Sequence, residues 1–232
     1  MILAAHHPAY LPDITFLAKM LYSDILVLTD DFQYSKHAQI NRCRIKTVHG
    51  IQWLTVPVLT SGKGAQSIAH VEIERHLKWR RRHKRSIEVN YTYSAYYEPV
   101  MEMLVDIYNR KWRFLCEMNI ALIERFCSFL NLDTKVALSS EIRDCSNGFN
   151  KIIALMEFYN CTIYLADACY AGYVKAHWPD NPGRDLHIGE YYPVPYFQQF
   201  GEFIGNLSMI DLIFNEGLNS VAIARQSFKL RV

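Results

Sequence analysis

The sequence predicts an α/β fold in which a mostly parallel sheet is flanked by helices. The chain opens with a strand–helix–strand pattern, and apolar runs of strand length then alternate with amphipathic helical stretches. The 232 residues, of which 50% are hydrophobic and 21% charged, are enough for one domain with a large core. We therefore expect a single domain over residues 1–232.

The opening pattern is the clearest part of the sequence. Residues 1–5 form a short apolar run that ends at a proline-containing loop, which is typical of a fully buried strand. Residues 14–21 carry apolar side chains at helical spacing behind Asp13, a residue type that favours the N-cap. The run 25–28 is then a second buried strand. Such a unit forms parallel strands through a right-handed crossover, so the fold is expected to be Rossmann-like.

The elements that follow are read from periodicity and turn residues. Segments 39–46 and 52–58 flank a turn at His49-Gly50 and predict a hairpin. Helical patterns over 77–91 and 96–130 predict a helical insertion at about residues 77–130. The rest is predicted as a strand at 132–139, a helix at 152–159, a strand at 162–166, a proline-rich loop at 179–195, and a helix at 204–214 that begins near Asn206.

Composition excludes several classes of function. The 25 basic and 23 acidic residues give a net charge of +2, which does not point to nucleic acid or a membrane as the main partner. Six cysteines lack CxxC or CxxH spacing, so we expect reduced and mostly buried thiols, with no metal and no cofactor. No basic leader precedes the first apolar run and no apolar stretch is long enough for a membrane span, so we expect a cytoplasmic protein.

Polar side chains follow both opening strands. His6 and His7 end the first strand, and Asp30 and Asp31 end the second. Because ligands in α/β sheets collect at the carboxyl ends of parallel strands, we expect the two pairs to converge on one catalytic cleft. Histidine acts as an acid or a base near neutral pH, and a carboxylate binds Mg²⁺ or an amine or acts as a base. The alternative is that these residues only cap loops and turns.

A basic extended segment follows. Arg42, Arg44 and Lys46 alternate behind Asn41, so they share one face of a strand and are suited to binding a carboxylate or phosphate. The alternative is an edge strand protected from aggregation by its charges. Cys43 lies between the arginines, where a thiolate would be favoured by charge.

The densest charge run covers residues 78–85 (KWRRRHKR). On a helix it wraps all faces, and the usual interpretation is a solvated surface. Trp79 and His83, four residues apart, could instead share an inward face that forms a second wall of the site. Contact with RNA is a third and weaker alternative.

Several blocks of the chain, in one order, resemble the WbqC-like family of bacterial proteins, which are often encoded with polysaccharide or O-antigen genes. The blocks are residues 6–12 (HHPAYLP), 23–36 (SDILVLTDDFQYSK), 41–46 (NRCRIK), 53–58 (WLTVPV), 78–79 (KW), His83, 90–91 (NY), 196–197 (YF) and 206–212 (NLSMIDL). The family usually has glutamine at the position of His7, small residues over 166–173, and asparagine at the position of Cys43. These departures indicate a divergent substrate pocket and argue against Cys43 as a nucleophile.

The resemblance implies a nucleotidyltransferase-like version of the Rossmann fold and a transfer reaction. Family members have been proposed to attach glycine or another acyl group to an amine, often on a sugar. By this resemblance His6 or Asp31 accepts the proton of the amine. The residues that the resemblance assigns to substrate or anion binding are Tyr10, Gln33, Tyr34, Lys36, Asn41, Arg42, Arg44, Lys46, Trp79, His83, Tyr91 and Asp167.

Three hypotheses of function remain open from the sequence. The first is an acyl- or aminoacyl-transferring enzyme that forms an amide in polysaccharide or secondary-metabolite biosynthesis. Its donor would be a carrier-protein thioester, a coenzyme A ester or an aminoacyl-tRNA. The second is a nucleotidyltransferase, although the chain lacks the HxGH spacing. The third is a non-catalytic module that binds a sugar or a carrier.

Overall fold

The fold is described from a computed structural model that covers residues 1–76, 78–142, 148–179 and 183–231. Three sequence-based expectations involve residues outside these ranges. They are the start of the predicted helix at Leu77, the thiol of Cys145, and residues 180–182 of the predicted proline-rich loop. Among the described residues, no helix is long and apolar enough to cross a membrane.

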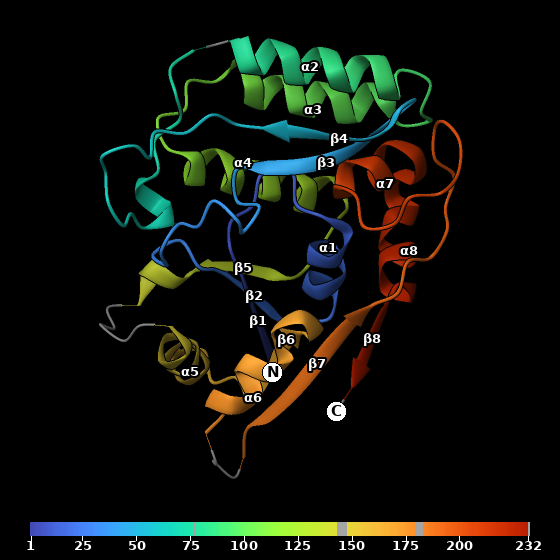
Figure 1. Cartoon of the computed structure of the whole chain (residues 1–232). Helices are drawn as coiled ribbons and strands as arrows, with labels where there is room; N and C mark the ends of the chain where they lie inside the picture. The colour runs from blue at the N-terminus through green and yellow to red at the C-terminus, as the bar shows by residue number, and fades with distance from the viewer. Residues whose placement is uncertain (77, 143–147, 180–182, 232) are drawn as a thin grey trace.

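The main sheet is mostly parallel, as predicted. Its six strands lie in the order β5-β2-β1-β6-β7-β8, and only β8 runs antiparallel to its neighbour (Figure 1). When the strands of this sheet are numbered 1 to 6 in chain order, leaving out β3 and β4, their order is 3-2-1-4-5-6, which is the doubly wound order of Rossmann-like folds. The strands are β1 (Ile2–His6), β2 (Ile25–Leu28), β5 (Lys135–Leu138), β6 (Ile163–Asp167), β7 (Asp185–Tyr191) and β8 (Phe228–Arg231).

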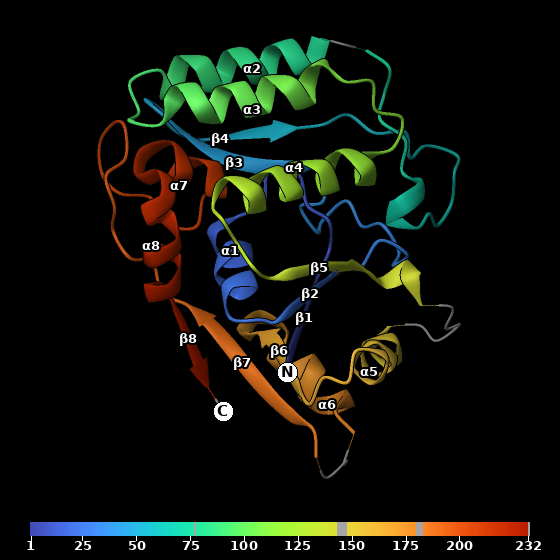
Figure 2. The ribbon, with the colours of Figure 1, turned by 180° about the vertical axis from the view of Figure 1, so that it is seen from behind.

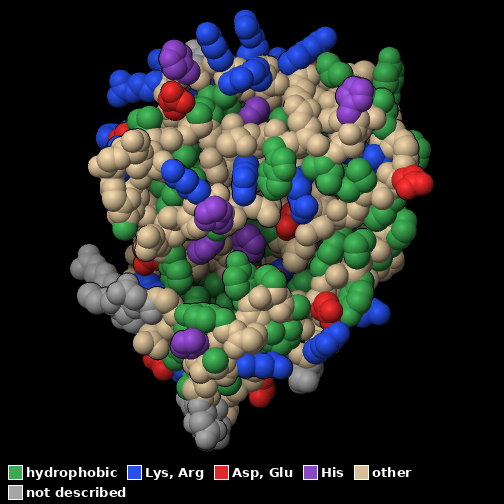
Figure 3. Space-filling model, in the orientation of Figure 1, with side chains coloured by type: hydrophobic (Ala, Val, Ile, Leu, Met, Phe, Trp, Pro, Cys, Tyr) green, Lys and Arg blue, Asp and Glu red, His purple; other side chains and the backbone are tan. Residues whose placement is uncertain are grey.

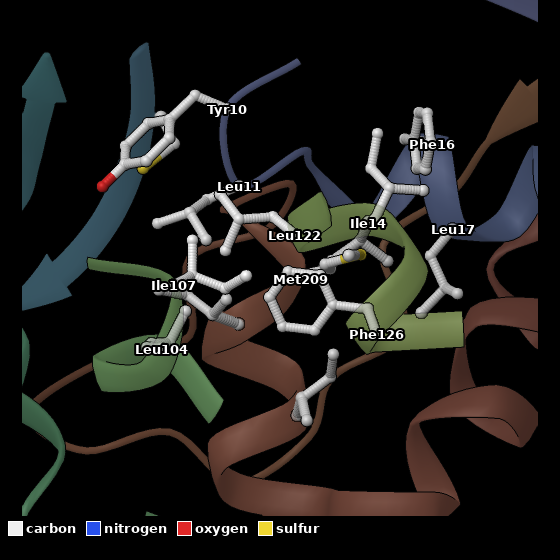
Figure 4. Packing of buried hydrophobic residues seen from close by; sticks show 14 of the residues in the cluster. Tyr10, Leu11, Ile14, Phe16, Leu17, Leu104, Ile107, Leu122, Phe126 and Met209 are labelled. Atoms are coloured by element: carbon white, nitrogen blue, oxygen red, sulfur yellow. The ribbon is translucent and has the colours of Figure 1, made fainter. Parts of the chain in front are cut away.

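Helices cover both faces of this sheet because its strands are apolar on both faces. In β1, Ala4 packs into one hydrophobic cluster while Leu3 and Ala5 pack into another, as the pleat requires. The first cluster lies under α1 (Ile14–Leu21), α4 (Leu115–Phe129), α7 (Met209–Glu216) and α8 (Ser220–Gln226). The second lies under α5 (Phe149–Phe158) and α6 (Ala171–His177). Figure 4 shows part of the first cluster, where Leu17 of α1 packs beside Phe126 of α4.

A second layer of structure lies at one end of the molecule. The hairpin of β3 (Arg42–Thr47) and β4 (Gly50–Thr55) is covered by α2 (Lys78–Tyr91) and α3 (Tyr97–Asn109) (Figures 1 and 2). The helical stretch predicted over 96–130 is interrupted here. The backbone carbonyl of Arg113 accepts from Ile73 N, and Leu115 N donates to the carbonyl of Val71. These long-range bonds replace the helical bonds that the sequence pattern favours.

Two other predictions differ from the structure. The loop predicted over 179–195 contains β7, which pairs with β6 on one side and β8 on the other. The last predicted helix begins at Met209 and not near Asn206, because Asn206 has a left-handed φ of 51° and Ser208 caps the helix through Ile210 N. Besides β7, the elements not predicted are α6, α8 and β8, and the short 3₁₀ turns η1 (Ile68–His70), η2 (Ser139–Glu141), η3 (Ala168–Tyr170) and η4 (Gly217–Asn219).

Candidate functional site

Two cavities open beside each other at the carboxyl ends of β1 and β6. One has a volume of about 370 Å³ and the other of about 260 Å³, and His6, Ala38, Asp167 and Tyr170 line both. These two strands are the neighbours between which the winding of the sheet reverses, and such switch points are where Rossmann-like folds bind ligands. Figure 3 shows this face hollowed near its middle, with histidine side chains beside the hollow and lysine and arginine side chains above them.

His6 lies at the junction of the two cavities in its neutral form. Burial, and then the charge of Lys19, lowers the pKa of His6 to about 4. The Nδ1 atom lies 2.8 Å from the carbonyl oxygen of His7, which only accepts hydrogen bonds, so the proton is assigned to Nδ1. The Nε2 atom has no hydrogen-bond partner among the described residues. Its lone pair is therefore available to a ligand in the cavities.

A buried ion pair lies next to His6. Lys19 of α1 places Nζ 2.6 Å from Oδ2 of Asp167 at the end of β6, and the two side chains are only 3% and 12% exposed. The second carboxylate oxygen, Oδ1, is buried and has no hydrogen-bond partner among the described residues. Because a buried acceptor without a donor is costly, an amine or hydroxyl of a ligand is a favourable partner for it.

The larger cavity, which we call the apolar chamber, is mainly aromatic. Beyond His6 and the ion pair, its wall is made of apolar side chains from the loop after β2, from α5, from β6 and from α6. They include Phe32, Phe149, Ile152, Tyr164, Tyr170, Tyr173 and Val174. His7 also lines it, held by a 2.7 Å hydrogen bond between its Nδ1 and the hydroxyl of Thr29, and burial lowers the pKa of His7. This chamber suits an apolar or planar group.

The smaller cavity, which we call the polar chamber, carries two arginines. Arg42 and Arg44 extend from the same face of β3, and their guanidinium carbons lie 4.7 and 5.7 Å from the ring centre of Trp53. Arg44 also donates to the carbonyl of Asn206 at 2.6 Å, whereas Nε of Arg42 is buried without a hydrogen-bond partner among the described residues. Two adjacent guanidiniums, one of them with an unpaired N–H donor, suit a carboxylate or phosphate.

Asp13 places a carboxylate in the same polar chamber. It caps α1 as predicted, accepting from Phe16 N at 3.0 Å, and burial raises its pKa. The polar chamber therefore contains side chains of opposite charge, the two arginines and Asp13.

The predicted aspartate pair lies outside both chambers. Asp30 accepts from Ser140 N at 3.0 Å and from the hydroxyls of Ser139 and Ser140, and it is only 5% exposed. Asp31 accepts from Ser139 and lies 3.3 Å from Nζ of Lys151. The two carboxylates therefore attach the end of β2 to the segment after β5. The expectation that they converge with His6 and His7 on one cleft is not met by their side chains.

Another group of predicted residues is in the core. Trp79 and His83 do face inward together, but they pack against Tyr10 and Tyr108 and line neither chamber. Tyr10 reaches the polar chamber, while its hydroxyl is bonded to His83 Nδ1 at 2.9 Å.

Lys46, Tyr91 and Asn41 are also held within the fold. Lys46 donates from Nζ to Gln198 Oε1 at 3.1 Å, and Tyr91 donates to Asp211 at 2.7 Å. Asn41 donates to the carbonyl of Val56 at 2.9 Å.

The remaining predicted residues lie near the surface. Gln33 and Lys36 are exposed and line neither chamber, and Tyr34 is half-buried beside them. Burial raises the pKa of Tyr34, and the charge of Arg42 partly opposes this. Cys43 faces away from its arginine neighbours, and burial raises the pKa of its thiol, which removes the basis for a reactive thiolate.

Several residues of the site were not predicted, and Lys19 is the most important of them. A signal for it exists, since it is the one charged residue in the otherwise apolar helix 14–21. Thr29 follows the second predicted strand, and Tyr173 lies in the segment 166–173 that the sequence linked to the substrate pocket. Phe149 gave no comparable signal, because it reaches the apolar chamber only through the folding of a distant segment.

Acid is expected to destabilise the protein through its buried histidines. Burial lowers the pKa of both His6 and His83 to about 4, against about 6.5 in an unfolded chain. The unfolded state therefore takes up these protons first, and stability present above pH 6.5 is lost as the pH falls toward 4. We expect a loss on the order of 1–3 kcal/mol per histidine. Melting temperatures between pH 7.5 and 4.5 measure it, and a value independent of pH would contradict the expectation.

Comparisons with known proteins agree with the resemblance seen in the sequence. A family model described as the WbqC-like protein family matches residues 7–223. The chain is 29% identical over 220 residues to the uncharacterized protein Rv1507c of Mycobacterium tuberculosis, and the alignment covers 90% of each chain. No solved structure matches the chain.

Proposed function

This chain belongs to the WbqC-like protein family, and we propose that it is an enzyme that transfers an acyl or aminoacyl group to an amine and forms an amide. The observation that carries the proposal is the neutral His6, whose Nε2 lone pair is unused at the junction of an apolar chamber and an arginine-bearing chamber. A base between two binding pockets is what a reaction between two bound substrates requires.

The low basicity of His6 is sufficient for the proton transfer in this reaction. Attack of an amine nitrogen on the carbonyl carbon of a thioester or ester gives an adduct whose cationic nitrogen is far more acidic than a free ammonium. A weak base therefore suffices, and burial keeps His6 in its basic form throughout the neutral range. The carbon–sulfur or carbon–oxygen bond then breaks, and the leaving group takes the proton from His6 Nε2. The products are the amide and a thiol or alcohol.

The neighbouring ion pair supports the same step. Nζ of Lys19 lines the apolar chamber and is almost fully buried, so its charge would stabilise the oxyanion of the adduct in a water-poor environment. The unpartnered Oδ1 of Asp167 would accept a hydrogen bond from the attacking amine and orient it toward the donor carbonyl. In this proposal Asp167 holds the acceptor, and His6 moves the proton.

The two chambers would then receive different parts of the substrates. Arg42 and Arg44 would bind a phosphate or carboxylate, and the aromatic wall with Phe149 and Tyr164 would bind the apolar portion of the donor or acceptor. The boundary that the two chambers share at His6 and Tyr170 would be the place where the two groups meet.

The proposal is tested by direct detection of the amide. The purified protein is incubated with an isotopically labelled glycyl thioester of N-acetylcysteamine. The acceptor is an amino sugar, offered free and as its nucleoside-diphosphate derivative. We expect a labelled N-glycyl product by mass spectrometry, formed faster with the phosphorylated acceptor because Arg42 and Arg44 bind its charge. Absence of amide with both acceptors and with an acyl thioester series would overturn the proposal.

A further inference from the structure

We propose that the exposed basic face of α2 is the docking site for a small acidic carrier protein that delivers the acyl group as a thioester. This inference rests on the proposed function, since it names the form in which the donor arrives. The face is defined by Lys78, Arg81, Arg82, Lys84 and Arg85.

The first argument is the concentration of charge. Residues 78–85 contain six of the 25 basic residues, while the whole chain carries a net charge of only +2, so the rest of the chain is net negative. Figure 3 shows lysine and arginine side chains projecting together at the end of the molecule where α2 lies. One helix therefore presents a localised positive field to solvent, which attracts an acidic partner.

The second argument is that these charges do not stabilise helix α2. The first turn of α2 has no acidic residue and begins with cations, an arrangement that opposes the helix dipole. Within the described part of the chain, Lys78, Arg81 and Arg82 have no ion-pair partner. Glu88 alone approaches the run, at 3.7 Å from both Lys84 and Arg85. Binding of an acidic partner accounts for this charge pattern, whereas helix stability does not account for it.

The third argument concerns the kind of partner. A shallow groove of about 770 Å³ runs between α2 and β4, lined by Gln52, Arg82, Arg85 and Val89 among others. Val89 lines this groove and is 56% exposed. Aliphatic side chains next to arginines are typical of a protein interface, whereas a nucleic acid is bound mainly through its phosphates and by stacking of its bases. The surface therefore favours an acidic protein over RNA.

The fourth argument is the short route from this face to the site. Ser86 of α2 donates to Gln52 of β4 at 2.8 Å, and the next residue, Trp53, lies against Arg42 and Arg44 of the polar chamber. The β3–β4 hairpin lies between α2 and the polar chamber. A flexible prosthetic arm on a docked carrier would pass around the edge of that hairpin to bring its thioester to His6.

The test uses the full chain with Arg81→Glu, Arg82→Glu and Arg85→Glu combined. The probe is a fluorescently labelled bacterial acyl-carrier protein in its phosphopantetheinylated form, and binding is measured by anisotropy at two salt concentrations. We expect the dissociation constant to rise roughly tenfold or more, as loss of several exposed charge pairs predicts. The matched control reverses three cations on other faces, with Lys135→Glu, Arg225→Glu and Lys229→Glu, and is expected to bind within about twofold of wild type.

Turnover separates this inference from the proposed function. The α2 variant is expected to have a raised KM for the glycyl thioester of the carrier and an unchanged kcat/KM for the glycyl thioester of N-acetylcysteamine. Absence of amide from both thioesters, with carrier binding lost only in the α2 variant, would overturn the function and retain the docking site. Wild-type carrier affinity in the α2 variant, equal weakening in the control, or tighter binding of tRNA than of the carrier at this face would overturn the docking site. If the triple variant does not fold, Val89→Glu is measured in its place with the same expectations.

Discussion

Replacement of His6 by asparagine is expected to lower kcat/KM for amide formation by about 10²–10⁴-fold, the usual contribution of a general base. The amide nitrogen of asparagine takes the place of Nδ1 and retains the hydrogen bond to the carbonyl of His7, so the fold is preserved. The lone pair of Nε2 is removed. Steady-state rates with the glycyl thioester and the acceptor measure the effect, and the substrate dissociation constants are expected to stay within a few-fold of wild type.

His7→Asn is the matched control for this variant. His7 is also partly buried and lines the apolar chamber, but its Nδ1 is bonded to Thr29 and it does not reach the polar chamber. A loss in His7→Asn as large as that in His6→Asn would remove the assignment of His6 as the base. Unchanged ligand binding and pathway output in both variants would instead support the non-catalytic binding module.

The pH profile gives a second view of the same residue. Since the pKa of His6 is lowered to about 4, kcat/KM of the wild type, calculated on the concentration of unprotonated acceptor amine, is expected to be flat from pH 8 to about pH 5 and to fall below that. An acid limb centred near pH 6.5 would indicate a base with an unperturbed imidazole.

The position of the site was predictable from the sequence because strand ends are marked by abrupt changes from apolar to polar residues. His6, His7 and Asp167 all follow such ends, and the structure brings them together. Asp30 follows a strand end too. Its side chain turns to Ser139 and Ser140, and nothing local in the sequence specifies that partner.

The inward face of α2 shows the limit of periodicity. The spacing of Trp79 and His83 correctly predicts that they share a buried side of the helix. What lies opposite that side depends on the β3–β4 hairpin and on α3, which separate α2 from the chambers (Figure 2). The pair therefore belongs to the core, where His83 bonds to Tyr10, and not to the wall of the site.

Strand β7 was missed for a related reason. Its aliphatic residues are few, chiefly Leu186 and Ile188, and it lies in a region rich in proline. It is a strand because β6 and β8 satisfy its backbone hydrogen bonds on both sides, and Ile188 completes the second core cluster. Hydrogen bonds to neighbouring strands determine that this segment forms a strand, and local sequence propensity does not reveal those bonds.

Replacement of Asp211 by alanine is expected to destabilise the protein by about 3–5 kcal/mol, because it leaves buried donors without their acceptor. Asp211 is fully buried on α7 and accepts from Tyr91 at 2.7 Å, from Tyr196 at 2.6 Å and from Gln198 at 2.8 Å. Thermal denaturation is expected to show a fall in melting temperature of roughly 6–20 °C for a chain of this size.

The matched comparison is Tyr196→Phe, which removes one of the three donors and keeps the acceptor. Its cost is expected to be about 1 kcal/mol, the net worth of a single hydrogen bond. Equal destabilisation by Asp211→Ala and Tyr196→Phe would show that the three bonds do not act as one buried network.

The network also reaches the site, because Gln198 accepts from Lys46 of β3 and fixes the segment that leads to Asn206, where Arg44 is anchored. At temperatures where Asp211→Ala is still folded, its KM for a phosphorylated acceptor is therefore expected to rise, although Asp211 itself lines neither chamber.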